Sequence, residues 1–218
     1  MSRGWKTILF DLDGTLTDPK EGITQGIARA LAHYGIHEEP DNLSCFIGPP
    51  LTECFISRYG FSEKQCEEAV QVFRVYFNDR GWAENRPYDG IEALLSRLKD
   101  AGKQLAVATT KPEGPSKRIL THFGLADYFD LICGTPDHAP VGWEKSRIVE
   151  DALKRAGVTD LDTAVMVGDR KFDIIGAHAK GLSAIGVLYG YGDRAELEEC
   201  GADYITENPQ SLGALLLE

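Results

Sequence analysis

Hydrophobic residues in the second half of the chain follow two alternating periods. Short apolar runs, typical of buried strands, are separated by longer segments in which apolar residues recur every three or four positions, as on one face of a helix. We predict strands at 104–109, 131–133, 164–167 and 182–187, and helices at 91–101, 112–123, 145–156, 172–180 and from about 209 onward. This alternation is typical of an α/β fold with a doubly wound, Rossmann-like parallel sheet, which binds ligands at the carboxyl ends of its strands.

The first half of the chain begins with one more predicted strand, at residues 7–10. After it, strands and helices no longer alternate. Residues 23–34 and 66–77 keep helical spacing, and the turn Gly48-Pro49-Pro50 between them cannot be helical throughout. We therefore predict a small α-helical domain inserted after the first strand. The predicted division is a core of residues 1–17 and 86–218 and an insert of residues 18–85.

Composition and charge narrow the class of protein. The 218 residues are 43% hydrophobic and 26% charged, with a formal net charge of −11. An acidic chain is poorly suited to nucleic acid, whose binding requires a basic face. Its five cysteines are scattered and never spaced as C-x-x-C, a pattern typical of reduced thiols. Neither a signal peptide nor a transmembrane segment is predicted, so we expect a cytoplasmic protein without a membrane partner.

Two aspartates at the end of the first strand are the main candidates for chemistry. Asp11 and Asp13 follow a buried strand, and side chains two apart on an extended backbone point to the same side. Two such carboxylates repel each other unless a cation is present, and Mg²⁺ suits hard oxygen ligands. An EF-hand loop is excluded because Leu16 and Gly22 stand where that motif requires glycine and glutamate.

Three later segments bring further candidates to predicted strand ends. Thr109 and Thr110 end one strand, where they could bind phosphate or, in the case of Thr110, cap the next helix. Lys145 starts a helix after a loop at 134–142, against the preference of the helix dipole, or belongs to a solvated charged turn. Asp169 and Asp173, four apart at a helix start, are either helix-capping acids or, with the first pair, ligands of one metal ion.

Together these motifs resemble the haloacid dehalogenase superfamily, in the branch of small phosphatases with a helical cap. The resemblance covers essentially the whole chain. Within the superfamily, the chain is similar to the phosphoglycolate phosphatase and 5′-nucleotidase subgroup. It is carried by Asp11-Leu12-Asp13-Gly14-Thr15-Leu16, Thr109, Lys145, Gly168-Asp169 with Asp173, and the later segment 186–192.

The resemblance implies a Mg²⁺-dependent phosphomonoester hydrolase acting on a small phosphorylated metabolite. Asp11 would attack phosphorus to form an aspartyl-phosphate, and Asp13 would serve as acid and then base. The implied metal ligands are Asp11, the backbone carbonyl of Asp13, Asp169 and, in support, Asp173. The implied phosphate- and substrate-binding residues are Thr109, Thr110, Lys145 and Gly14. The cap would contact the leaving group and exclude water.

Other functions stay open at this stage. A phosphosugar mutase or phosphotransferase of the same superfamily would share these motifs and differ in the acceptor of the phosphoryl group. A non-catalytic relative is a further alternative. So is a dinucleotide-binding protein, because Gly190-Tyr191-Gly192-Asp193-Arg194-Ala195 matches G-x-G-x-x-A after a predicted strand. The identity of the phosphomonoester, and the choice between monomer and homodimer, are not determined by the sequence.

Overall fold

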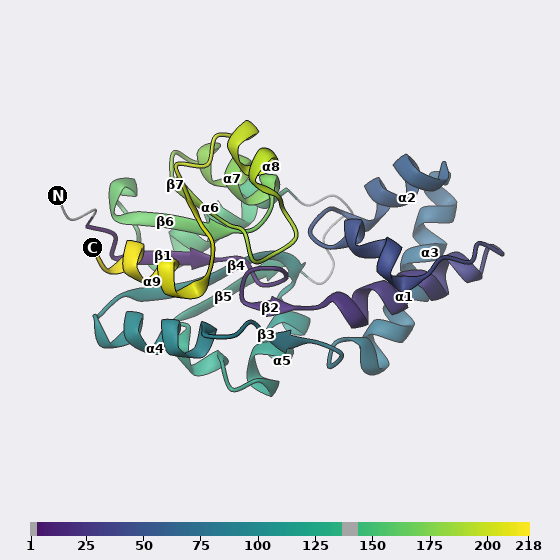
Figure 1. Ribbon diagram of the computed structural model, residues 1–218, viewed down its shortest axis with the longest axis horizontal. Coiled ribbons are helices and arrows are strands. Elements are labelled where there is room, and N and C mark those ends of the chain that lie inside the picture. The colour runs from purple at the N-terminus through teal and green to yellow at the C-terminus, as the bar shows by residue number, and fades with distance from the viewer. Residues whose placement is uncertain (1–3, 137–143) are drawn as a thin grey trace. The chain divides into compact units, whose positions relative to one another are not determined.

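The chain divides into two compact units that are described separately. The computed structural model describes residues 4–136 and 144–218 (Figure 1). The chain passes from the core unit into the insert unit after Thr17 and returns to the core unit at Pro87, so that the insert unit consists of Asp18–Arg86. Two short strands form a two-stranded ribbon at these crossing points, β2 (Thr17–Asp18) and β3 (Arg86–Pro87).

The core unit is built on a six-stranded sheet in the order β5-β4-β1-β6-β7-β8, and every recorded pairing within it is parallel. The prediction of a Rossmann-like α/β fold is therefore confirmed. The central position of β1 places the end of the first strand between the ends of β4 and β6. The strands are β1 (Thr7–Phe10), β4 (Gln104–Pro112), β5 (Leu131–Thr135), β6 (Ala164–Gly168), β7 (Ser183–Val187) and β8 (Tyr204–Thr206).

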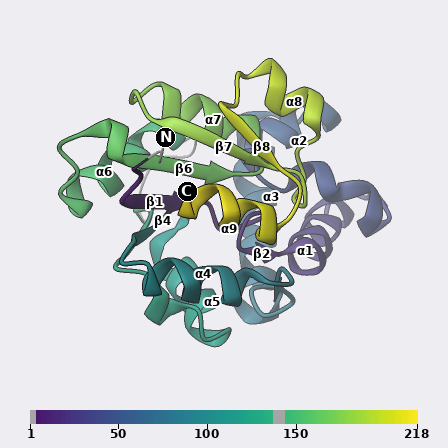
Figure 2. The same cartoon turned by 60° about the vertical axis from the view of Figure 1, so that its left-hand side comes forward.

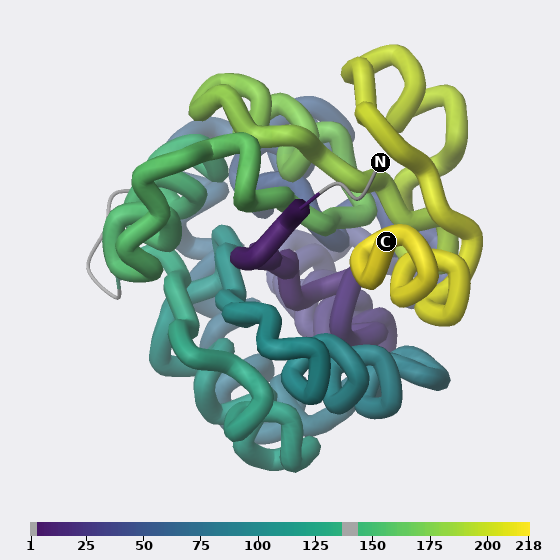
Figure 3. Tube along the Cα trace, turned by 90° about the vertical axis from the view of Figure 1, so that its left-hand side faces the viewer, coloured from purple at the N-terminus to yellow at the C-terminus, as the bar shows by residue number. Residues whose placement is uncertain are grey.

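Helices cover both faces of this sheet, which explains why its central strands are apolar throughout. Figure 2 shows α4 (Ile91–Asp100) and α5 (Glu113–His122) on one side, with α6 (Lys145–Ala156) and α7 (Lys171–His178) on the other. The terminal helix α9 (Pro209–Leu217) packs against α4 (Figure 3). Apolar side chains fill the layer beneath α6 and α7, among them Leu9, Ala106, Ile148, Val149, Met166 and Ile174.

Several predicted boundaries in the core unit are wrong. Strand β4 continues to Pro112, because its last residues pair with β5 across an irregularity between Ala108 and Pro112, and helix α5 accordingly begins one residue later than predicted. Helix α7 ends at His178 rather than at residue 180. The pattern also missed strand β8 and the short helix α8 (Arg194–Glu199), since six residues are too few to establish a helical period.

The insert unit is helical, and three of its elements were not predicted. Its first helix begins earlier than the spacing indicated and ends before Tyr34, and a π-helix continues α3. The segment between these helices contains a 3₁₀ helix and helix α2, which the proline-rich turn had obscured. The elements are α1 (Lys20–Ala32), a 3₁₀ helix (Pro40–Phe46), α2 (Leu51–Tyr59), α3 (Glu63–Tyr76) and a π-helix (Phe77–Gly81).

Two backbones approach closely where α1 meets the π-helix. A Cβ atom built on Gly22 would lie 1.9 Å from the carbonyl oxygen of Gly81. Gly22→Ala is therefore expected to destabilise the protein by about 1–3 kcal/mol, the usual cost of overpacking. The sign is opposite to that of an ordinary Gly→Ala change in a helix, which stabilises by up to about 1 kcal/mol. Urea unfolding measures the difference.

Gly213→Ala in α9 is the matched control, because its Cβ would meet only the ends of flexible side chains, Leu94 Cδ1 at 3.0 Å and Arg97 Nη1 at 3.5 Å. A Gly22→Ala protein at least as stable as its parent would contradict the close approach.

No helix in the described part of the chain combines the length and the apolar character needed to cross a membrane.

Candidate active site

Three carboxylates from two strand ends form a buried cluster. Asp11 directly follows β1, and its backbone N–H still donates to the Val167 carbonyl of β6, at 2.9 Å. Asp169 follows β6, and Asp173 lies in the first turn of α7. Oxygens of the three aspartates lie within 4.8 Å of one another, and each residue is buried. The parallel pairing of β1 and β6 thus brings together acids that are about 160 positions apart in the sequence.

Lys145, the first residue of α6, extends its ammonium group into this cluster. Its Nζ lies 2.7 Å from Asp11 Oδ1 and 2.6 Å from Asp173 Oδ1, and the side chain is only 4% exposed. The reading of Lys145 as part of a solvated charged turn is therefore wrong. Burial alone would lower the pKa of Lys145, but the two carboxylates outweigh it and the pKa lies above its ordinary value. The predicted loop before Lys145 lies largely outside the described residues, at 137–142.

Asp169 and Asp173 are held in different ways, although the sequence suggested one shared helix start. Asp173 accepts the Arg170 N–H at 3.1 Å and so caps α7. Asp169 precedes the helix and accepts instead from Thr15 Oγ1, at 3.1 Å, and the Tyr191 N–H, at 2.8 Å. Burial and the neighbouring carboxylates raise the pKa of Asp169 well above its ordinary value. Burial likewise raises the pKa of Asp173 to about 6, although Lys145 opposes this.

Asp13 lies apart from the three-carboxylate cluster and has its own cation. Its Oδ2 is 2.7 Å from Lys111 Nζ, whereas its Oδ1 is buried with no hydrogen-bond partner. Burial raises the pKa of Asp13, with Lys111 acting in the opposite direction. Sequence reasoning missed Lys111, although it directly follows Thr110 at the end of the same predicted strand. The two aspartates of the D-x-D motif thus face different partners.

The remaining predicted residues occupy the same end of the sheet in different environments. Thr109 is buried, and its hydroxyl accepts the Lys111 N–H at 3.3 Å. Thr110 is exposed and does not cap α5, because β4 continues past it and Pro112 occupies the N-cap position. Gly14 has a positive φ of 86°, and a Cβ there would lie 2.2 Å from Asp169 Oδ2. Only glycine allows the first motif to approach Asp169 this closely.

The donor set of the cluster suits a hard divalent cation. Three carboxylates and one ammonium leave a net negative charge in a buried region, and burial of like charges is costly unless a cation compensates them. Carboxylate oxygen is the ligand type that Mg²⁺ prefers. The residues present therefore fit a magnesium site at this end of the sheet.

Comparison with known proteins agrees with this arrangement. A family model described as haloacid dehalogenase-like hydrolase matches residues 8–187, which include the whole carboxylate cluster. The chain belongs to the haloacid dehalogenase-like hydrolase family. The resemblance inferred from the motifs is thereby confirmed.

Relatives within the haloacid dehalogenase-like family carry several functional names. A 5′-nucleotidase from Pseudomonas aeruginosa is 43% identical over 195 residues, 88% of this chain and 87% of that protein. Tyrosine-protein kinase PtkA from Mycobacterium tuberculosis is 38% identical over 200 residues, 91% of this chain and 67% of the kinase. The crystal structure of a predicted phosphatase from Clostridium acetobutylicum is similar with a TM-score of 0.92 and 44% identity, covering 98% of both chains. Other relatives are named phosphoglycolate phosphatase and pyrophosphatase PpaX.

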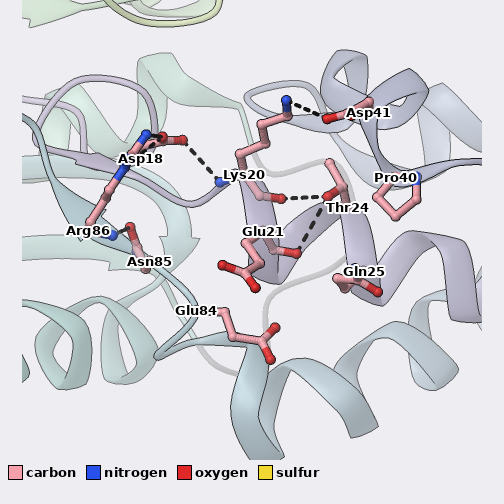
Figure 4. A pocket seen from close by; sticks show the side chains of 10 residues that line it. All are labelled: Asp18, Lys20, Glu21, Thr24, Gln25, Pro40, Asp41, Glu84, Asn85 and Arg86. Atoms are coloured by element: carbon pink, nitrogen blue, oxygen red, sulfur yellow. Dashed lines mark hydrogen bonds and ion pairs between the residues drawn. The ribbon is translucent and has the colours of Figure 1, made fainter.

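The insert unit of this family member has a polar pocket of its own. The pocket has a volume of about 510 Å³ and is lined from the start of α1, the 3₁₀ helix and the returning segment 84–86. Figure 4 shows the Lys20 ammonium directed at Asp41, which it meets at 2.7 Å, with Glu21 and Glu84 among the other lining residues. The turn Gly48-Pro49-Pro50 of the same unit is not among the lining residues.

Proposed function

We propose that this protein is a Mg²⁺-dependent phosphatase of small phosphomonoesters. The observation that carries the proposal is the buried cluster of Asp11, Asp169 and Asp173, with Lys145 paired to Asp11 and Asp173. Such a cluster provides a nucleophilic carboxylate, ligands for a divalent cation and a fixed positive charge in one place. Family membership and the phosphatase names of the relatives support the same reaction.

In the proposed reaction, an oxygen of Asp11 attacks phosphorus while the ester bond to the leaving oxygen breaks. Asp13 gives its proton to that oxygen, which leaves as an alcohol. Asp13 then takes a proton from water, the water oxygen attacks the aspartyl-phosphate, and inorganic phosphate is released with Asp11 regenerated. The raised pKa of Asp13 suits a residue that must begin this cycle protonated.

The other residues of the site would bind the metal ion and the transferring phosphoryl group. Asp11, the Asp13 carbonyl, Asp169 and Asp173 would hold Mg²⁺, whose charge offsets the repulsion between a carboxylate nucleophile and an anionic phosphate. Lys145 and Thr109 would bind oxygens of the transferring phosphoryl group, and lysine suits this task as a compact charge. Substrates of the kinds named by the relatives, 5′-nucleotides, phosphoglycolate and pyrophosphate, form the first set to test.

The proposal is tested by phosphate release from a panel of phosphomonoesters and pyrophosphate. With Mg²⁺ we expect turnover of at least one member. Removal of the metal with EDTA is expected to reduce the rate by about a hundred-fold or more, because the metal's charge contributes several kcal/mol to the transition state. Excess Mg²⁺ added afterwards should restore the rate. The proposal would be contradicted if no phosphate were released from any member of the panel, or if EDTA did not reduce the rate of release.

A second candidate, transfer of the phosphoryl group to a hydroxyl other than water, is favoured by the kinship with PtkA. The two functions differ in the fate of the phosphoryl group. Label from a γ-labelled nucleoside triphosphate that appears on tyrosine, with little free phosphate, would favour transfer. Label recovered as inorganic phosphate favours hydrolysis.

A further inference from the structure

The segment after β7 wraps closely around Asp169. Its Tyr191 N–H donates to Asp169 Oδ2 at 2.8 Å. A Cβ on Gly190 would lie 2.4 Å from Asp169 Cβ, and one on Gly192 would lie 2.0 Å from the Asp169 carbonyl oxygen. The glycines that suggested a dinucleotide motif thus allow a backbone to reach Asp169, since any side chain at either position would collide with it.

Helix α8, which follows this segment, contacts Arg170 and Lys171, the two residues directly after Asp169. Glu196, in the first turn of α8, receives Arg170 in a two-pronged ion pair, with Nε to Oε1 at 2.9 Å and Nη2 to Oε2 at 3.3 Å. Glu196 Oε1 also accepts the Lys171 N–H, the first amide of α7, at 2.8 Å. Asp193 fixes Glu196 in turn, by accepting its backbone N–H at 2.8 Å.

Arg170 connects these contacts to the carboxylate cluster. It lies directly after Asp169 in the chain, and its backbone N–H donates to Asp173 Oδ2 while its side chain is held by Glu196. Both partners of the ion pair are largely shielded, with side chains 13% and 22% exposed. Bidentate arginine–carboxylate pairs fix geometry as well as charge. Rotation of the backbone at Asp169 and Arg170 would therefore break the ion pair with Glu196. It would displace the two candidate metal ligands Asp169 and Asp173 together.

We propose that residues 190–196 form a clamp that sets the metal-binding geometry of Asp169 and Asp173, with Glu196 and Arg170 as its positioning residues. The inference rests on the proposed magnesium site and goes beyond it, because neither side chain is a ligand. Groups that orient metal ligands commonly change metal affinity by about 10- to 100-fold when they are removed. A surface ion pair with no such role would change stability alone.

The test compares Glu196→Gln, Arg170→Gln and the double variant with the parent. Each single change removes the ion pair, while glutamine at 196 can still accept the Lys171 amide. Mg²⁺ affinity is measured by calorimetry, and the Tm is measured in EDTA. Each single variant is expected to bind Mg²⁺ about ten-fold more weakly, and the double variant no more weakly than either, since each single change already removes the same ion pair. The kcat should recover at saturating Mg²⁺, with the KM for substrate unchanged.

Glu150→Gln is the matched control. Glu150 pairs with Lys180, just beyond the other end of α7, so the change removes an ion pair near the same helix without touching the loop. Mg²⁺ affinity should then equal that of the parent. If the Glu196 and Arg170 variants bind Mg²⁺ as tightly as the parent, the clamp is refuted and the magnesium site stands. If the parent itself binds no Mg²⁺, the magnesium site and the clamp are both refuted.

Discussion

Asp11→Asn is expected to reduce kcat by about a thousand-fold or more, in line with the loss of a covalent nucleophile in other enzymes. The amide nitrogen and oxygen of asparagine occupy the same space as the carboxylate but are poor nucleophiles toward phosphorus. The change also removes one of the two carboxylates that hold Lys145, 2.7 Å away. Steady-state phosphate release, with a rapid-quench search for a phosphorylated protein, measures the effect.

Asp127→Asn, an exposed aspartate between α5 and β5, is the control for an equal change of charge. It should leave kcat unaltered. Because Asp11 is buried, circular dichroism and a Tm measurement should accompany the assay, so that loss of the fold is not mistaken for loss of the nucleophile. A folded Asp11→Asn protein that turns over as fast as its parent would exclude Asp11 as the nucleophile.

Lys145→Met is expected to lower the free energy of unfolding by about 3 kcal/mol in EDTA, the usual cost of removing one partner from a buried ion pair. Methionine has a similar volume, so the cost arises from charge rather than from a cavity. The Lys145 ammonium contacts both Asp11 and Asp173, and without it three buried carboxylates face one another with no cation. Because Mg²⁺ would supply the missing charge, the deficit should shrink when excess Mg²⁺ is added.

Urea unfolding with and without Mg²⁺ measures both parts of this prediction. Lys180→Met is the control, since its partner Glu150 is exposed and surface pairs contribute about 1 kcal/mol or less. A Lys145→Met protein as stable as the parent in EDTA would show that the carboxylates do not depend on this ammonium. Equal destabilisation with and without Mg²⁺ would argue against a cation in the cluster.

Local sequence signals were sufficient for the alternation of strands and helices. The apolar run at Thr7–Phe10 and the periodic segment at Lys145–Ala156 correspond to elements with the predicted bounds. Boundaries failed where long-range pairing overrode local preference. Strand β4 extends to Pro112 because β5 lies beside it, although Pro112 was predicted to lie in the first turn of a helix, a position that proline favours.

The candidate site shows the same division between local and distant causes. The motifs singled out Asp11, Asp169 and Lys145 because each stands beside a strand or helix boundary. They gave no sign that Lys111 would meet Asp13, or that Glu196 would meet Arg170, since a lysine or glutamate on an exposed-looking turn carries no signal of its partner. Such partners are defined by which strands become neighbours.

The sequence by itself determined the class of fold and most of the acids that matter, because period and motif spacing are local properties of the chain. Only the tertiary structure decided how charge is distributed among them. Parallel pairing of β1 with β6 brought Asp11 and Asp173 together, and the packing of α6 against β4 and β5 placed Lys145 between them. Pairing of β1 with β4 brought Asp13 to Lys111. The physical reason is that electrostatic partners in a buried site are selected by distance in space, which the sheet order sets and the sequence interval does not.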